Sequence, residues 1–332
     1  MHYGALVIVD HGTIEEKATQ ETSAWPSAED SELVEPLFIL GSPRSFTSLV
    51  CAMLGQNPAA YGVPELNLFM ESTIGALVEE LSSRFRQIQL HGLLRTVAQL
   101  YGGEQTMNAV DMARRWLFRR YDWTTQAVYR ELCKTVSPLR IVDKSPIYTQ
   151  KRETLDRISQ TFPNAFYIHL VRHPLTQGES MMKVAKGLMA ILADSIDYDT
   201  DPPTVDPQII WYQMQQNIMG FLKGIPAHRQ LRLRGEEVLS DPVPYLESVC
   251  GWIGFPRDDF AVECMLHPED SPFANVGPWG ANLGNDLNFL RSARFRPGRV
   301  RLGTLEGRLP WRADGKGFDD HVVALARELG YQ

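Results

Sequence analysis

The sequence predicts an α/β fold in which helices flank a central, mostly parallel sheet. Short apolar segments alternate with long helical patterns, and the short segments are apolar throughout rather than on one face only. One of them runs through a tight polar loop directly into a helix. With 332 residues, of which 44% are hydrophobic and 22% charged, the chain is long enough to bury a large core.

The expected strands are short and the expected helices are long. Strands are predicted at 37–41, 140–143, 166–171 and 231–234. Helical patterns cover 67–90, 105–119, 123–135, 151–161, 175–192, 207–222 and 241–253, and a last helix covers 317–329. The helices between the first two strands form a helix-rich insertion. We expect it over the carboxyl ends of the strands, where ligands bind in such sheets, and therefore over the active site.

The beginning of the chain differs from the rest. Its apolar core spans only residues 5–9, which is too short for a secretory signal, and residues 18–35 are polar. We therefore expect an N-terminal arm or linker over 1–35 and one domain over 36–332.

The overall composition argues against several classes of function. A net charge of −7 disfavours a broad nucleic-acid surface, and no apolar run approaches the roughly 18 residues of a membrane span. The histidines form no spacing typical of a metal site, so no metal is expected. The four cysteines lack C-x-x-C spacing, which is typical of reduced thiols in a cytoplasmic protein.

The most informative segment is PLFILGSPRSFTSLV, residues 36–50. It has the layout of a phosphate-binding loop, G-x-x-x-x-G-K-[ST], with Phe46 in place of the second glycine and Thr47 in place of the lysine. Backbone N–H groups, hydroxyls and the Arg44 guanidinium gather at a helix N-terminus, which favours an anion. Without the lysine, the loop would lose its contact to the β- and γ-phosphates of ATP. The segment therefore predicts a P-loop-like site for a phosphate-containing ligand other than ATP.

A second candidate anion site follows the strand at 166–171. Arg172 stands at the strand end, His173-Pro174 starts the next helix, and Ser180 lies two turns into it. An arginine can bind phosphate through two parallel hydrogen bonds, and the serine can add a hydroxyl. The alternative is that Arg172 pairs with a carboxylate in the core.

Together with a third segment, RGEEVLSDP at 234–242, these motifs resemble the nucleotide-binding elements of sulfotransferases. Those enzymes use 3′-phosphoadenosine 5′-phosphosulfate (PAPS). The resemblance covers about residues 36–260 and is strongest to the tyrosylprotein type and to the bacterial polyketide or assembly-line type. It implies PAPS as co-substrate, 3′-phosphoadenosine 5′-phosphate (PAP) as product, and no requirement for a metal.

The resemblance also implies roles for individual residues. The 5′-phosphosulfate would be held by Arg44, Ser45, Phe46, Thr47 and Ser48. The 3′-phosphate would be held by Arg172 and Ser180, and covered by a C-terminal basic segment whose best candidates are Arg296 and Gly298. Two residues depart from the family pattern. Phe46 replaces the usual glycine, which predicts a loop built without a positive φ there, and Gly235 replaces the usual tyrosine near the adenine.

Sulfuryl transfer needs a base for the acceptor hydroxyl, in-line geometry and cations around the transferring group. Glu65 lies in a P-E-L segment similar to that of the catalytic glutamate in the resembling enzymes, although it could instead cap a helix starting near Asn67. Lys144, in D-K-S-P, resembles a lysine that contacts the transferring group, or is a plain strand-end lysine. His267 is a rival base, because many cytosolic sulfotransferases use a histidine, or is an ordinary loop residue.

The resemblance therefore implies a sulfotransferase that moves the sulfuryl group of PAPS in line to an acceptor hydroxyl. The acceptor would be a small-molecule natural product or a hydroxyacyl group on a carrier protein, with no nucleic-acid or membrane partner. Glu65 would be the base, and Arg44 and Lys144 would stabilise the transferring group. The alternatives are a non-catalytic PAP-binding or structural protein of the same fold, and a small-molecule kinase. The missing loop lysine and the lack of an aspartate poised for Mg²⁺ disfavour the kinase.

Overall fold

The computed structural model describes residues 33–332, except 84–85, 185–186, 297 and 299. The predicted arm over 1–35 lies outside the described residues apart from its last three. The predicted domain over 36–332 lies within the described part, apart from those gaps.

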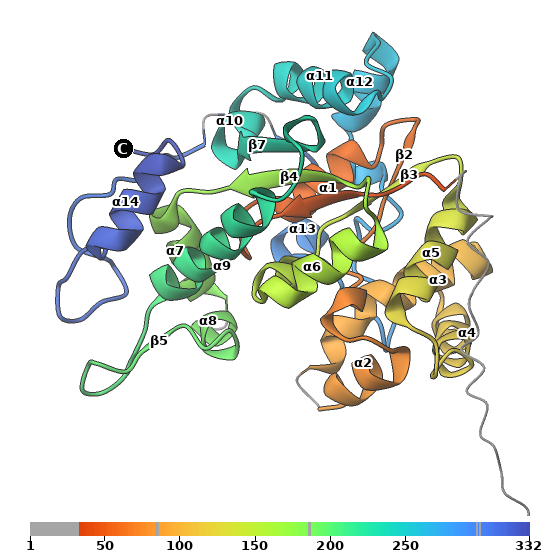
Figure 1. Cartoon of the computed structure of the whole chain (residues 1–332), viewed down its shortest axis with the longest axis horizontal. Helices are drawn as coiled ribbons and strands as arrows, with labels where there is room; N and C mark the ends of the chain where they lie inside the picture. Colours follow the sequence, from red (N-terminus) through yellow and green to blue (C-terminus); the bar gives the residue numbers. More distant parts are fainter. Residues whose placement is uncertain (1–32, 84–85, 185–186, 297, 299) are drawn as a thin grey trace, which may run out of the picture. The chain divides into compact units, whose positions relative to one another are not determined.

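A five-stranded parallel sheet forms the centre of the described part of the chain, in the order β2-β3-β1-β4-β7 (Figure 1). Its strands are β1 (Leu37–Leu40), β2 (Ala60–Gly62), β3 (Arg140–Asp143), β4 (Phe166–Val171) and β7 (Gln230–Arg234). Two further short strands, β5 (Ile196–Asp197) and β6 (Thr204–Val205), pair antiparallel. The predicted α/β fold with a parallel sheet is confirmed.

Helices fill the connections between the strands. Among the described residues they are α1 (Thr47–Leu54), α2 (Ile74–Glu80), α3 (His91–Gly102), α4 (Met107–Phe118), α5 (Thr125–Val136), α6 (Arg152–Thr161), α7 (Pro174–Lys183), α8 (Leu188–Leu192), α9 (Pro207–Leu222), α10 (Gly235–Ser240), α11 (Pro242–Ile253), α12 (Asp259–Met265), α13 (Leu287–Arg291) and α14 (Asp320–Glu328). Short 3-10 turns include η2 (Leu68–Met70), η3 (Gln87–Leu90) and η7 (Pro268–Asp270).

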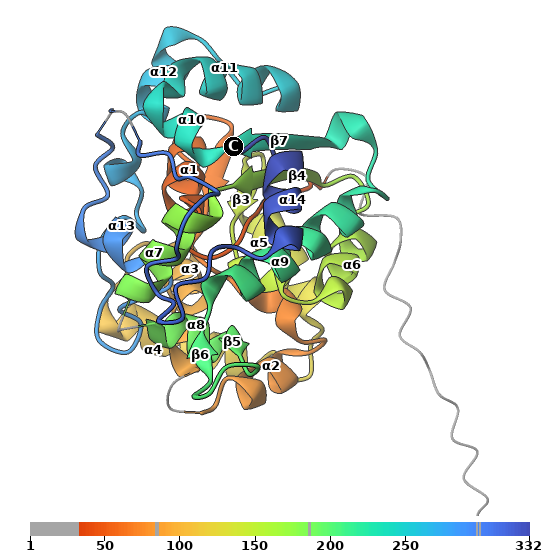
Figure 2. The ribbon, with the colours of Figure 1, turned by 90° about the vertical axis from the view of Figure 1, so that its left-hand side faces the viewer.

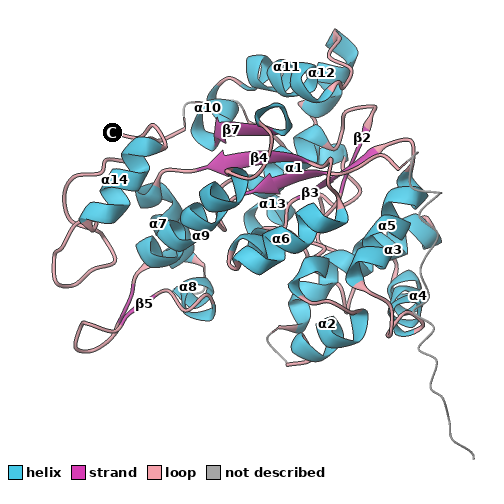
Figure 3. Ribbon diagram, in the orientation of Figure 1, coloured by secondary structure: helices cyan, strands magenta, loops and turns pink. Residues whose placement is uncertain are grey.

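Both faces of the sheet are covered by helices, as Figure 3 shows. Alternate residues of β1 point to opposite faces: Leu37 and Ile39 pack in the core cluster that includes residues of α1, α11 and α12. Phe38 and Leu40 pack in the larger cluster with residues of α3, α5, α6 and α9. A strand buried on both sides needs apolar residues at every position, which explains its continuous apolar sequence.

The helix predicted over 67–90 is wrong as a single element. The structure breaks it into η2, α2 and η3, because Asn67 has a positive φ of 55° and Thr73 starts a new helix by accepting the Ala76 N–H. The Thr125 N–H at the start of α5 also donates to the Ser72 carbonyl, and Thr73 forms a β-bridge with Thr124. Helix α3 and strand β2 were not predicted, since β2 is only three residues long.

The helix predicted over 175–192 is likewise two helices, α7 and α8. Gly187 lies between them with φ +87°, a conformation that interrupts a right-handed helix.

The carboxyl ends of β1, β3 and β4 meet at one edge of the sheet. Seen in Figure 2, this edge is bordered by α7 and α13. Helices α2–α5, the predicted insertion, gather below β2 and β3 in Figure 1. They reach the edge through α3, whose Gly92 packs so closely on Glu65 that a Cβ there would lie 2.0 Å from the Glu65 carbonyl oxygen.

Candidate active site

The loop after β1 is tight and fixed from within. The buried hydroxyls of Ser42 and Ser45 share a hydrogen bond of 2.9 Å, and Gln177 of α7 donates to the Pro43 carbonyl at 2.8 Å. Ser45 thus supports the loop from behind, while Thr47 begins α1 and Ser48 follows it. The first turn of α1 carries no acidic residue, so its N-terminus remains suited to an anion.

Phe46 adopts φ +64° and ψ +9°, the left-handed conformation. The expectation that the loop avoids a positive φ at this residue is therefore wrong. Packing overrides the backbone preference, because the ring occupies the space above Gly235 and lies under the Arg172 guanidinium, 4.2 Å from the ring centroid. A Cβ on Gly235 would lie 2.6 Å from Phe46 Cδ2. The two departures from the family pattern are therefore one adaptation: the glycine makes room for the ring.

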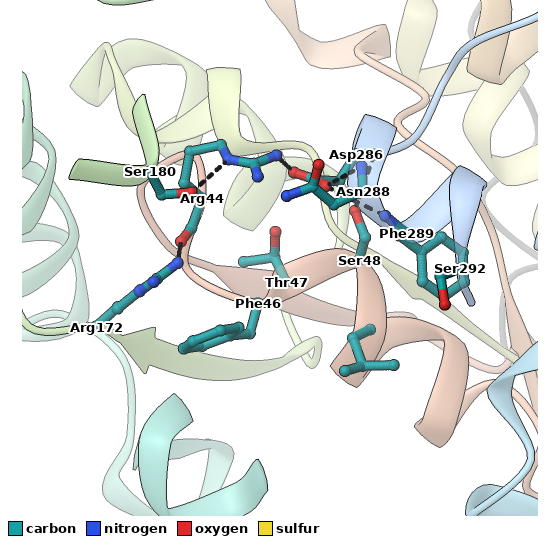
Figure 4. Close-up of a pocket in the computed structure, with 11 residues that line it drawn as sticks. Arg44, Phe46, Thr47, Ser48, Arg172, Ser180, Asp286, Asn288, Phe289 and Ser292 are labelled. Atoms are coloured by element: carbon teal, nitrogen blue, oxygen red, sulfur yellow. Dashed lines mark hydrogen bonds and ion pairs between the residues drawn. The ribbon is translucent and has the colours of Figure 1, made fainter. Parts of the chain in front are cut away.

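A cavity of about 290 Å³ opens at this edge of the sheet (Figure 4). Of the residues predicted to bind the nucleotide, Arg44, Phe46, Thr47, Ser48, Arg172 and Ser180 line it. Its other lining residues were not predicted: Leu49, Asp286, Asn288, Phe289 and Ser292. Four of these come from the segment around α13.

Arg172 lies at the end of β4 and points into this cavity with few partners. Its guanidinium donates to the Arg44 carbonyl and to the Thr176 hydroxyl, and no carboxylate pairs with it among the described residues. The pKa of the Arg172 guanidinium is lowered to about 10, mainly by burial; the charge of Glu236 opposes this shift and that of Arg44 adds to it. Arg172 is half-buried and forms no direct ion pair with a carboxylate of the described residues, and the buried Glu236 acts on it only through its charge. An anionic ligand would give the guanidinium a direct partner.

Arg44 has a different environment in the same cavity. Its Nε donates to Ser180 Oγ at 3.1 Å, and its guanidinium forms an ion pair with Asp286. Ser180 is thereby bonded to Arg44, while both line the same cavity as Arg172. Burial lowers the pKa of Arg44, and the charge of Glu65 opposes this shift, which places Glu65 within electrostatic reach of the loop.

Glu65 and Lys144 form a second ion pair, with 2.7 Å between Lys144 Nζ and Glu65 Oε1. The Lys144 side chain is 0% exposed and the Glu65 side chain 31% exposed, so the carboxylate is the accessible partner. Glu65 does not cap a helix: η2 begins after Asn67 and has no side-chain cap. Its own N–H donates to the Gly284 carbonyl at 2.8 Å.

Asp143, directly before Lys144, anchors this pair from inside the core. Its carboxylate accepts hydrogen bonds from Ser145 Oγ at 2.9 Å and from Tyr129 OH at 3.1 Å. Ser145 Oγ in turn accepts the N–H of Asn67, two residues after Glu65. Burial raises the pKa of Asp143 to about 7, against the hydrogen bonds that favour its ionised form. The network fixes the backbone on both sides of the Glu65–Lys144 pair.

The remaining predicted residues lie apart from these contacts. His267 is half-buried at the start of η7, where its ring is hydrogen-bonded to Glu263 at 3.1 Å and to Glu269 at 3.3 Å. Its described contacts include neither Glu65 nor Lys144. Arg296 and Gly298 are exposed and do not line the cavity. Their neighbours Pro297 and Arg299 lie outside the described residues. The roles of these three residues stay predictions.

Comparison with known proteins assigns the chain to a family. The family model described as the sulfotransferase family matches residues 36–259, which is more than half of the chain. The chain belongs to the sulfotransferase family. A search of curated proteins found no match.

Two solved structures support the same assignment. The sulfotransferase domain from the curacin biosynthetic pathway is 25% identical, with a TM-score of 0.70 over 91% of this chain and 99% of that domain. The sulfotransferase domain from the Synechococcus PCC 7002 olefin synthase is also 25% identical. Its TM-score is 0.70 over 93% of this chain and 98% of that domain.

The sulfotransferase thus carries two groups of charged residues at one sheet edge: the cavity with Arg44 and Arg172, and the pair of Glu65 with Lys144. Between residues 33 and 332, gaps aside, no three His, Cys, Asp or Glu side chains gather as a metal site would require. Over the same residues no helix is long and apolar enough to span a membrane.

Proposed function

We propose that this sulfotransferase uses PAPS and moves its sulfuryl group in line to an acceptor hydroxyl. The observation that carries the proposal is the 2.7 Å pair of Lys144 with Glu65 at the same sheet edge as the Arg44 and Arg172 cavity. This arrangement supports the proposal, because a carboxylate and an ammonium group lie at the same sheet edge as a pocket lined by two arginines.

The cavity residues fit an anionic nucleotide. The N-terminus of α1, the hydroxyls of Thr47 and Ser48 and the Arg44 guanidinium would hold the 5′-phosphosulfate. Arg172, half-buried and without a directly paired carboxylate among the described residues, would hold the 3′-phosphate, with Ser180 beside it. The lowered pKa of Arg172 supports this assignment, because a bound dianion would stabilise the charged form of the guanidinium that burial disfavours.

The transfer itself requires one proton acceptor and charge neutralisation. The acceptor oxygen forms a bond to sulfur while the bond from sulfur to the bridging phosphate oxygen breaks, and PAP leaves. Glu65, the exposed member of its pair, takes the hydroxyl proton. Lys144 and Arg44 neutralise charge on the transferring group and on the bridging oxygen.

The acceptor we propose is the hydroxyl of a small-molecule natural product or of a hydroxyacyl group carried by a protein. The support is the similarity to two sulfotransferase domains from biosynthetic systems, one for curacin and one an olefin synthase. We further propose that residues 36–332 form the catalytic unit and that it acts in the cytoplasm.

A thermal-shift comparison of PAP, 5′-AMP and ATP with Mg²⁺ tests the nucleotide. A ligand at about 100 times its Kd stabilises the folded state by roughly 2.7 kcal/mol, which shifts the melting temperature measurably. We expect a clear rise with PAP, a smaller one with 5′-AMP and none with ATP and Mg²⁺. A rise with ATP and Mg²⁺ alone would contradict the proposal and favour a kinase.

A further inference from the structure

The cavity contains one group that does not suit an anionic ligand. Asp286 lines it together with Arg44, Ser48 and Arg172. Figure 4 shows the Arg44 guanidinium directed toward Asp286 and away from Arg172. A carboxylate in this position repels a phosphosulfate and engages the cation that would receive it.

Asp286 makes one contact that a bound anion would make, the ion pair with the Arg44 guanidinium. Its carboxylate pairs with Arg44, and its Oδ1 accepts the backbone N–H groups of Asn288 at 2.8 Å and Phe289 at 3.3 Å. Its own N–H donates to Ser48 Oγ at 3.2 Å. The segment before α13 is therefore tied to the loop through the two residues, Arg44 and Ser48, that the proposed function assigns to the phosphosulfate.

We infer that Asp286 is an internal stand-in for the phosphosulfate, and that nucleotide binding displaces it and releases the segment 284–292. The inference rests on the proposed function only for the identity of the displacing nucleotide. An anion that takes the Arg44 guanidinium as its partner competes with the Asp286 carboxylate for it.

The released segment also touches the proposed base. Gly284, two residues before Asp286, accepts the Glu65 N–H at 2.8 Å. The preceding stretch stays fixed, since the buried Arg95 of α3 donates to the carbonyls of Leu283 at 3.0 Å and Asn275 at 2.8 Å. The displacement therefore begins after Leu283, and through Gly284 the occupancy of the nucleotide site is passed on to the backbone of Glu65.

Asp286→Asn separates the charge of this residue from its structural role. Asparagine accepts the N–H groups at the start of α13 as aspartate does, so the helix keeps its cap while the ion pair with Arg44 is lost. Asp258→Asn is the matched control. Asp258 caps α12 by accepting the Ala261 N–H at 2.9 Å, and it does not line the cavity.

Titration calorimetry of the whole chain with PAP, and separately with pyrophosphate, measures the competition. We expect Asp286→Asn to bind both about tenfold more tightly than the wild type, and Asp258→Asn to bind them as the wild type does. Unchanged affinity in Asp286→Asn would overturn the inference. Weaker binding would also overturn it, and would mean that Asp286 positions Arg44 for the ligand.

Hydrogen exchange provides the second readout. PAP should raise the exchange of amides in 286–292 of the wild type, whereas in Asp286→Asn this exchange should already be high without ligand. Slower exchange of the segment on PAP binding to the wild type would contradict displacement.

The two probes keep this inference separate from the proposed function. If the wild type binds PAP and Asp286→Asn gains affinity for neither probe, the proposed function stands and the inference fails. If the wild type does not bind PAP while Asp286→Asn gains affinity for pyrophosphate, the displacement stands and the nucleotide assignment fails.

Discussion

Two acidic residues pair with cations at the same edge of the sheet, but the structure holds them in different ways. Glu65 and Lys144 each lie just after a strand, and Lys144 is fully buried. Asp286 reaches Arg44 from a segment that follows the last strand of the sheet in the sequence. The two carboxylates are similarly exposed, at 31% and 23%, so exposure does not distinguish them.

The two carboxylates differ in the contacts that hold them in place. The Glu65–Lys144 pair is braced by the buried Asp143, through Ser145 and the backbone of Asn67. Within the described part of the chain, Asp286 is held by the first turn of the short helix α13, which packs through Phe289 and Leu290, and by the hydroxyl of Ser48. We infer that the first pair is permanent and serves the chemistry, whereas the second can be exchanged for a ligand.

The largest effect is expected from breaking the permanent pair. Glu65→Gln removes the proposed base and should lower turnover about 10²-fold or more while leaving PAP affinity unchanged, because Glu65 does not line the nucleotide cavity. Turnover is followed as PAP released from PAPS in the presence of an acceptor. The melting temperature of the variant is the control for folding.

Unchanged turnover in Glu65→Gln would move the base to another residue. Since the His267 ring is held by Glu263 and Glu269 at the surface, His267→Ala in parallel should have little effect. A loss in His267→Ala alone would reverse the two assignments.

The buried Asp143, which supports the Glu65–Lys144 pair, should make the stability of the protein depend on pH. The pKa of Asp143 is raised from 3.8 to about 7, so its contribution to stability is complete below pH 3.8 and is lost as the pH rises toward 7. Asp143→Asn cannot ionise. Between pH 5 and pH 8 the stability of this variant relative to the wild type should therefore rise by roughly 2–3 kcal/mol. Urea unfolding at both pH values measures this change, and an equal difference at both would refute the raised pKa.

In the nucleotide cavity, Arg172→Ala should weaken the binding of PAP about 10- to 100-fold and the binding of 5′-AMP far less, because only PAP carries the 3′-phosphate. Calorimetry with both ligands gives the ratio. Equal losses for the two ligands would show that Arg172 does not bind the 3′-phosphate.

The smallest effect is expected from Gly235→Ala, which places a Cβ where the Phe46 ring lies. The displaced ring no longer supports the Arg172 guanidinium, so PAP affinity should fall about three- to tenfold. In a Phe46→Gly background no ring is left to clash, so Gly235→Ala should there change PAP affinity very little. A double-mutant cycle detects this dependence of one substitution on the other. Additive losses would mean that the two positions are independent.

The same comparison explains which parts of the molecule the sequence could predict. The strands at 140–143 and 166–171 and the residues directly after them were predicted, because burial on both faces leaves a continuous apolar signal. Lys144 and Arg172 follow such strands, so local sequence was enough to mark them.

The parts that depend on distant contacts could not be predicted. Asp286 has no local pattern that points to Arg44, and the positive φ of Phe46 becomes favourable only where Gly235 and Arg172 surround the ring. The break of the helix after Glu65 depends on pairing with the chain before α5. In each case a contact between residues far apart in the sequence overrides the local preference.

The central claim is that the chain transfers a sulfuryl group with Glu65 as base. Its most direct test is to incubate the wild type and Glu65→Gln with PAPS labelled in the sulfuryl group. The panel of acceptors includes free natural-product alcohols and hydroxyacyl carrier proteins. The account predicts labelled product from the wild type and at least about 10²-fold less from Glu65→Gln at equal PAP affinity. Equal product from both proteins would contradict the assignment of Glu65. A wild type that binds PAP but transfers to no acceptor would contradict catalysis itself and favour a protein that only binds the nucleotide.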